Sequence, residues 1–105
     1  MLKIIQTNSK IYFITQNGEA YLLYNLKNGL MDIYETYVPE TERGKGVALL
    51  LVKEAFKYAI KNNLKIKPSC SYVYEYIQKN KNNKKLMQMV DPNYEDYTTQ
   101  NSCNL

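Results

Sequence analysis

Val38-Pro39-Glu40-Thr41-Glu42-Arg43-Gly44-Lys45-Gly46-Val47-Ala48 joins an apolar, strand-like run to an amphipathic, helix-like one. Two glycines in the opening turn of a helix each cost about 1 kcal/mol relative to alanine, so we expect them to have a compensating role. A helix N-terminus carries unpaired N–H groups, and glycines let an anion such as phosphate come close to them. Arg43, the only arginine of the chain, adds a planar fork that matches phosphate oxygens. The stretch therefore predicts an anion-binding loop, and the alternative is a glycine-rich turn that only leads into a core helix.

Length and composition limit the class of protein. A chain of 105 residues suits one domain with a two-layer core. The net charge of +4 is modest and the lysines are spread along the chain, so an anionic small molecule fits as well as nucleic acid. No apolar run approaches the roughly 18 residues that span a bilayer, and the N-terminus has no signal-peptide pattern. We therefore expect a cytoplasmic monomer that does not bind membranes.

The histidine and cysteine content limits the chemistry. The absence of histidine excludes an imidazole base and histidine metal ligands, and we expect no metal site. Cys70 and Cys103 are far apart in the sequence, and Cys103 lies in a polar segment. The sequence therefore predicts free thiols rather than a structural disulfide.

The first third of the chain has the pattern of an antiparallel meander. β-Branched and aromatic runs are separated by short turns, of which Asn17-Gly18 is the strongest hairpin signal. In the last of these runs the apolar positions are odd at Met31 and Ile33 but even at Val38, which predicts a β-bulge near Glu35. The strands are expected at residues 4–5, 11–15, 19–26 and 30–38.

The middle of the chain predicts a helix that packs on this sheet. Residues 64–67 alternate as a strand after the helix, and the order strand, helix, strand favours a parallel pair with the strand that ends at Val38. Ser69 or Ser71 could cap a second helix. We expect an α/β (α+β) fold with a mixed, mainly antiparallel sheet, in a domain of residues 1–90 followed by a flexible tail of residues 91–105. The helix that packs on the sheet is predicted by apolar residues at helical spacing, which are Ala48, Leu51, Val52, Ala55, Phe56 and Ala59.

Arg43-x-x-Gly46-x-Ala48 resembles the acetyl-CoA pyrophosphate motif, [RQ]-x-x-G-x-[GA], of GNAT-type N-acetyltransferases. Two further segments, residues 35–39 and 65–77, are similar in order and spacing to a subfamily that consists of one minimal GNAT domain, the bacterial YjdJ-like proteins. The resemblance covers roughly residues 10 to 90. It implies that acetyl-CoA is a ligand. From the order of elements along the chain, we also expect the main helix to begin within a residue or two of Gly44.

The resemblance also implies roles for the loop residues. The backbone of Val38 would pair with the pantetheine arm, and Arg43 would start the pyrophosphate loop. The amides of Gly44, Lys45, Gly46, Val47 and Ala48 would hold the pyrophosphate. The chain departs from the family on the acceptor side, because Glu35 and Asn80 stand where relatives often have histidine.

Three residues are candidates for the acetyl-transfer chemistry. Glu35 could accept the proton of the amine, or it could be a solvated carboxylate on an exposed strand. Cys70 could be a nucleophile, a polarisable wall near the thioester, or a small core residue. Tyr72, or Tyr76 one turn later, could protonate the departing thiolate.

The sequence thus predicts an acetyl-CoA-dependent N-acetyltransferase that acts by direct attack of an unidentified amine. One alternative is a protein that binds acetyl-CoA or CoA with little catalysis. A small basic RNA-binding module is another, because the glycine loop invites comparison with that of KH domains. The KH loop separates its two glycines by two residues and lies between helices, whereas Gly44 and Gly46 are separated by one residue and follow a strand.

Overall fold

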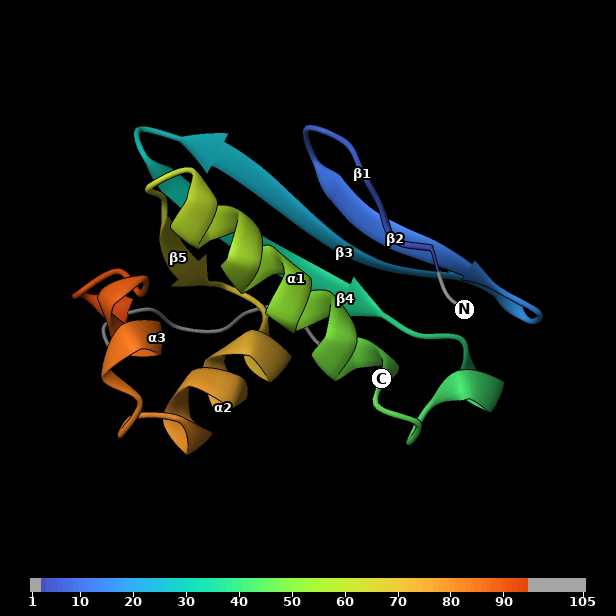
Figure 1. Cartoon of the computed structure of the whole chain (residues 1–105). Helices are drawn as coiled ribbons and strands as arrows, with labels where there is room; N and C mark the ends of the chain where they lie inside the picture. The colour runs from blue at the N-terminus through green and yellow to red at the C-terminus, as the bar shows by residue number, and fades with distance from the viewer. Residues whose placement is uncertain (1–2, 95–105) are drawn as a thin grey trace.

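The computed structural model describes residues 3–94 and shows an open, five-stranded sheet with its helices gathered beside one face (Figure 1). The strands lie in the order β1-β2-β3-β4-β5, and each pair is antiparallel except β4 and β5, which are parallel. The predicted mixed, mainly antiparallel sheet is confirmed. The strands are β1 Ile5–Gln6, β2 Lys10–Thr15, β3 Gly18–Lys27, β4 Leu30–Tyr37 and β5 Lys65–Pro68.

A β-bulge interrupts β4 close to the predicted position. Leu23 of β3 pairs with Glu35 and the next residue, Tyr24, pairs with Ile33, so Tyr34 has no partner in the ladder. Because side chains alternate across a strand, the extra residue explains why the buried positions change from odd to even along β4. The predicted bulge near Glu35 is confirmed.

The parallel pairing of β4 with β5 is short. It runs from Leu30 with Lys65 to Ile33 with Pro68, and the last backbone hydrogen bond along this edge is donated by the Cys70 N–H to the Ile33 carbonyl, at 2.9 Å. Among the described residues, no strand pairs with the β5-facing edge of β4 after this point. Within residues 3–94, the backbone edge of residues 34–38 is therefore open where the two strands diverge.

The helices are the short 3-10 helix η1 Glu40–Glu42, α1 Val47–Lys61, α2 Ser71–Lys79 and α3 Lys84–Gln88. The main helix begins three residues after Gly44, one residue later than predicted. Gly44 and Gly46 have φ angles of 81° and 82°, which lie in the left-handed region and cannot continue a right-handed helix. The predicted serine cap of α2 is wrong, because Cys70 is the N-cap residue and the Ser69 hydroxyl donates to Asp32 instead, at 2.6 Å.

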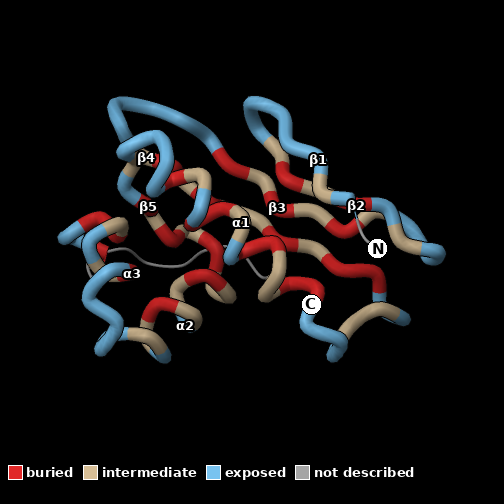
Figure 2. Tube along the Cα trace, in the orientation of Figure 1, coloured by how far each residue is buried: buried red, intermediate tan, exposed pale blue. Residues whose placement is uncertain are grey.

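Helix α1 covers one face of the sheet, and no helix of residues 3–94 covers the other, which we call the uncovered face. Leu51, Val52 and Ala55 of α1 are fully buried, and burying each large apolar side chain contributes about 1.5–3 kcal/mol. Figure 2 shows the buried positions running along the sheet strands and the facing side of α1. On the opposite face, alternation places side chains such as Tyr21 and Tyr37, which are half-buried.

The described C-terminal residues pack against the edge strand β5. Val90 forms an isolated bridge with Ile66, and the Asp91 N–H donates to the Ile66 carbonyl at 2.9 Å. The Tyr94 side chain is buried, with its ring centroid 5.9 Å from that of Tyr74. The first four residues of the predicted tail are thus in contact with the domain, while residues 95–105 lie outside the described residues. Within residues 3–94, no helix is both long and apolar enough to cross a bilayer.

Candidate active site

A cavity of about 230 Å³ lies where β4 gives way to α1. We call it the loop cavity. Its walls come from the end of β4, the glycine loop, the first turn of α1 and the start of α2, so the fold brings four segments together at this point. The lining residues are Val38, Glu42, Arg43, Gly44, Gly46, Val47, Ala48, Leu49 and Tyr72.

The glycine loop presents backbone N–H groups to this cavity. Gly46 is the N-cap of α1, and no described side chain caps the helix. The N–H groups of the first turn therefore lack partners within the helix and carry its partial positive charge. A Cβ atom placed on Gly44 or Gly46 would have nothing within 4 Å, so the space beside the loop is open. These features suit an anion such as a diphosphate.

Arg43 connects the loop to the end of β4. Its Nε donates to the Val38 carbonyl at 2.8 Å, and its guanidinium carbon lies 5.8 Å from the centroid of the Tyr37 ring. It forms no ion pair with any residue in the described part of the chain. One edge of the guanidinium thus fixes the loop, and the remaining N–H donors can serve an anion.

Lys45 lies in the loop but its side chain does not line the cavity. Its Nζ is 3.7 Å from a carboxylate oxygen of Glu42, and the Asn17 side chain donates to the same oxygen at 2.7 Å. The carboxylate that borders the cavity is therefore partly neutralised. Of the predicted loop residues, Lys45 can contribute its backbone amide rather than its charge.

Glu35 lies on the uncovered face of the sheet. Tyr21 donates its hydroxyl to a Glu35 carboxylate oxygen at 3.0 Å, and the Tyr21 ring stacks on that of Tyr37 with centroids 5.3 Å apart. Burial first, and the hydrogen bond to Glu35 second, raise the pKa of Tyr21, so its hydroxyl remains protonated at neutral pH. Glu35 forms no ion pair within the described region, which leaves its negative charge available to a cationic or proton-donating group.

Cys70, the N-cap residue of α2, lies against the other face of β4. Its side chain is fully buried, and its Sγ is 3.6 Å from the hydroxyl oxygen of Thr36, whose side chain leaves β4 opposite to that of Glu35. The prediction of free thiols is wrong for Cys70, which is disulfide-bonded, and residues 3–94 contain no free cysteine. Distance along the sequence does not prevent a bridge, because pairing depends on the separation of the Cα atoms in the folded chain. Cys103 lies outside the described residues.

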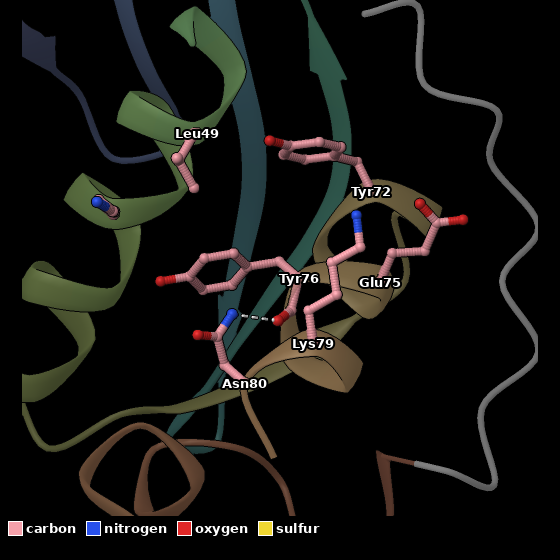
Figure 3. A pocket seen from close by; sticks show the side chains of 7 residues that line it. Leu49, Tyr72, Glu75, Tyr76, Lys79 and Asn80 are labelled. Carbon is pink, nitrogen blue, oxygen red and sulfur yellow. Dashed lines mark hydrogen bonds between the residues drawn. The ribbon is translucent and has the colours of Figure 1, made fainter. Parts of the chain in front are cut away.

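Tyr72 stands between the loop cavity and a second cavity of about 360 Å³, which we call the interhelix cavity. Burial is the main cause that raises the pKa of Tyr72, followed by the neighbouring Tyr76 and Glu75. Its hydroxyl is therefore a proton or hydrogen-bond donor at neutral pH. The interhelix cavity lies between α1 and α2 (Figure 3) and is lined by Leu49, Lys53, Tyr72, Glu75, Tyr76, Lys79 and Asn80.

The interhelix cavity was not predicted from the sequence, although two signals for it were present. Leu49 and Lys53 are four residues apart, so they lie on one face of α1, and Leu49 is an apolar residue outside the stripe that packs on the sheet. On α2, Tyr72, Tyr76 and Lys79 share a face for the same reason. Only the packing of α2 beside α1 shows that these two faces meet.

Comparison with known proteins supplies the family. The family model described as GCN5-related N-acetyl-transferase matches residues 11–86, more than half of the chain. Protein NATD1 of Gallus gallus is 34% identical over 65 residues, which cover 61% of this chain and 59% of that protein. Protein NATD1 of Homo sapiens gives the same identity over 61% of this chain and 58% of its own length, and that of Danio rerio is 32% identical over 66% of each.

The match to the family model extends from β2 to α3 and thus includes the loop cavity. The aligned part spans less than two thirds of the Gallus gallus and Homo sapiens relatives. The narrower subfamily of YjdJ-like proteins stays a prediction. The matched family model is consistent with the glycine loop at the start of α1 and with the divergence of β4 from β5. This chain belongs to the GCN5-related N-acetyltransferase family.

Proposed function

We propose that this protein binds acetyl-CoA at the loop cavity and transfers the acetyl group to an amine. The observation that carries the proposal is the uncapped glycine loop beside the open edge of β4. A helix N-terminus suits a diphosphate, and an unpaired strand edge suits the amide groups of a pantetheine arm. Family membership supports the same ligand. When bound, acetyl-CoA would supply an acetyl thioester.

The residues that would hold acetyl-CoA are those predicted from the sequence. The N–H groups from Gly44 to Ala48 would bind the diphosphate, and Arg43 would add a charged donor. The backbone of Val38 would pair with the pantetheine arm. Its carbonyl already accepts from Arg43, but a carbonyl oxygen has two lone pairs, so a second hydrogen bond is compatible with the first.

For the transfer step, we propose direct attack by the amine. Glu35 would accept a proton from the amine, directly or through water, because its carboxylate is on the uncovered face and is oriented by Tyr21. Tyr72 would donate a proton or hydrogen bond to the departing thiolate. Cys70 would form a buried wall beside Thr36 rather than attack, since a disulfide sulfur is not a thiolate.

Calorimetric titration with acetyl-CoA tests the proposed site. The Gly46→Glu substitution places a bulky anionic side chain in the open space beside the loop, and we expect the affinity to fall at least about 100-fold. Gly29→Glu is the matched control, because Gly29 has a φ angle of 79° and equally open surroundings but lies in the β3–β4 turn. Both variants place a side chain on a backbone with a positive φ angle, so both carry the same kind of backbone strain. Equal dissociation constants for the two variants would refute the site.

An acetyl-CoA-binding protein with little catalysis is the second candidate, favoured by the absence of histidine from the chain, which removes the most common general base. Release of free CoA thiol in the presence of a panel of primary amines separates the two functions, because a binder releases no more thiol with amines than without them. Titration with a single-stranded RNA in the same calorimeter tests the nucleic-acid alternative.

A further inference from the structure

We propose that the acceptor amine carries a carboxylate at the far end of an aliphatic chain, and that a third cavity binds this carboxylate. This cavity, which we call the turn cavity, has a volume of about 220 Å³ and is lined by Asn25, Lys27, Asn28, Leu30, Asp32 and Lys67. The inference rests on the proposed function, because it needs acetyl transfer with Glu35 as the proton acceptor. It adds the chemical class of the acceptor.

The turn cavity lies on the same face of the sheet as Glu35. Asp32 stands between two fully buried residues of β4, so its side chain is on the uncovered face. Asn25 of β3 and Lys67 of β5 pair with Asp32 and therefore share that face. An acceptor bound along the uncovered face can thus contact both Glu35 and the turn cavity.

The pairing register gives the distance between Glu35 and the turn cavity. Glu35 pairs with Leu23 of β3, whereas Asp32 pairs with Asn25, two residues further along that strand. Two residues of a strand span about 7 Å, so the near wall of the cavity is about that far from Glu35. Lys27 lies two residues further still, at about 14 Å. An acceptor that reaches both places has its amine and its carboxylate about 7–14 Å apart.

The charges of the turn cavity suit an anion. Asp32 is the one carboxylate among the described residues that line it, and this carboxylate accepts from the Ser69 hydroxyl at 2.6 Å. Lys67 pairs with Asp32 on the neighbouring strand, so the two opposite charges share one row of the sheet. Lys27 is exposed and forms no ion pair with any residue from 3 to 94. The lining therefore has one positive charge in excess, which attracts a carboxylate.

Two carboxamides add neutral donors to the turn cavity. Asn28 and Gly29 form the β3–β4 turn with φ angles of 53° and 79°, and positive φ at both positions is typical of a tight, two-residue hairpin turn. The turn holds Asn28 next to Lys27, while Asn25 belongs to the strand itself. Each NH₂ group can donate to a carboxylate oxygen. A volume below the range of about 300–1,000 Å³ suits one anionic group rather than a whole ligand.

The surface between Glu35 and the turn cavity suits an aliphatic chain. Leu23, which pairs with Glu35, is half-buried, and so is Leu30 in the cavity wall. Methylene groups that pack on these two side chains leave contact with water. The spacing, the charge and the apolar surface together describe an ω-amino acid.

The carboxylate of such an acceptor takes no part in the chemistry. The amine nitrogen forms a bond to the acetyl carbon, and the bond from that carbon to sulfur breaks. One amine proton goes to Glu35, and the departing thiolate takes a proton from Tyr72. Removal of the carboxylate should therefore raise KM far more than it changes kcat.

The experiment measures amine-dependent release of CoA thiol with 6-aminohexanoate and with hexylamine, which has a methyl group in place of the carboxylate. We expect kcat/KM to be about tenfold or more higher for 6-aminohexanoate, through a lower KM. The same comparison between 3-aminopropanoate and propylamine should show no preference, because this short acceptor cannot span about 7 Å. The preference for 6-aminohexanoate should decrease as ionic strength rises.

Two variants and one spectrum test the location. Lys27→Ala should bring the ratio of the two kcat/KM values to about one. Lys57→Ala is the matched control and should keep the wild-type ratio, because it removes an exposed lysine from α1. In the NMR spectrum of the isotope-labelled protein saturated with CoA, 6-aminohexanoate should shift the side-chain amide signals of Asn25 and Asn28. Hexylamine should leave these signals in place.

The outcomes separate this inference from the proposed function. Equal kcat/KM for 6-aminohexanoate and hexylamine, or a preference that survives in Lys27→Ala, would refute the carboxylate site while acetyl transfer stands. Unshifted signals of Asn25 and Asn28 at saturating 6-aminohexanoate would refute it as well. If wild type does not bind acetyl-CoA, or if no amine stimulates thiol release, the proposed function fails and this inference fails with it.

Discussion

At the scale of single residues, the hydrogen bond from Tyr21 to Glu35 orients the one carboxylate that we propose as proton acceptor. Glu35→Gln keeps the shape and can still accept from Tyr21, but the amide cannot take a proton. We expect amine-dependent release of CoA thiol to fall by about 10²–10⁴-fold, with the dissociation constant for acetyl-CoA unchanged.

Glu19→Gln is the matched control for this prediction, because Glu19 is another carboxylate at the sheet surface and it is paired with Lys10. Activity should remain close to that of wild type in this variant. If Glu35→Gln and Glu19→Gln are equally active, Glu35 is a solvated surface carboxylate and the proton acceptor lies elsewhere.

At the scale of elements, the bulge at Tyr34 divides β4 into two parts. Side chains alternate between the two faces of the sheet within each part, and the bulge shifts this alternation by one residue. Deleting Tyr34 would bring Ile33 and Glu35 into consecutive positions, opposite Tyr24 and Leu23, so the ladder with β3 would become regular and no side chain would change face. The deletion variant should therefore still unfold cooperatively. We expect its affinity for acetyl-CoA to fall about tenfold or more, because a straighter β4 would close the gap that opens beside β5.

Circular dichroism melts and acetyl-CoA titrations of the Tyr34 deletion measure the two parts of this prediction separately. Tyr34→Ala is the control, since it removes the side chain and keeps the extra backbone residue. An unchanged dissociation constant in a folded deletion variant would show that the bulge is not needed for the site.

At the scale of the whole molecule, residues 91–94 test where the domain ends. A chain that stops after Tyr94 retains the hydrogen bond from Asp91 to Ile66 and the ring contact with Tyr74. A chain that stops after Val90 loses both, and we expect it to be less stable by about 2–4 kcal/mol. Both chains should still unfold in one cooperative transition, because the main core lies between α1 and the sheet.

Urea titrations of the two truncated chains give this difference directly. Loss of cooperative unfolding in the chain that ends at Val90 would show that residues 91–94 belong to the domain core. Equal stability of the two would show that their contacts contribute nothing measurable.

Local sequence patterns were sufficient wherever a short-range rule decides the outcome. Asn17-Gly18 predicted the β2–β3 hairpin because few residues adopt the required turn. The change of apolar phase in β4 predicted its bulge, since alternation on a half-buried strand depends only on neighbours. The start of α1 was placed slightly too early because both glycines, and not only one, adopt the left-handed conformation.

The sequence by itself determined the order of strands and helices, the bulge and the position of the glycine loop before the main helix, because each depends on backbone preferences within a few residues. Only the tertiary structure decided which side chains share a space. It placed Glu35 and Cys70 on opposite faces of β4, gave Cys70 a disulfide instead of a free thiol, and joined the faces of α1 and α2 into one cavity. These outcomes depend on how elements far apart in the chain pack together, and packing is determined by the sum of many weak contacts that no local pattern contains.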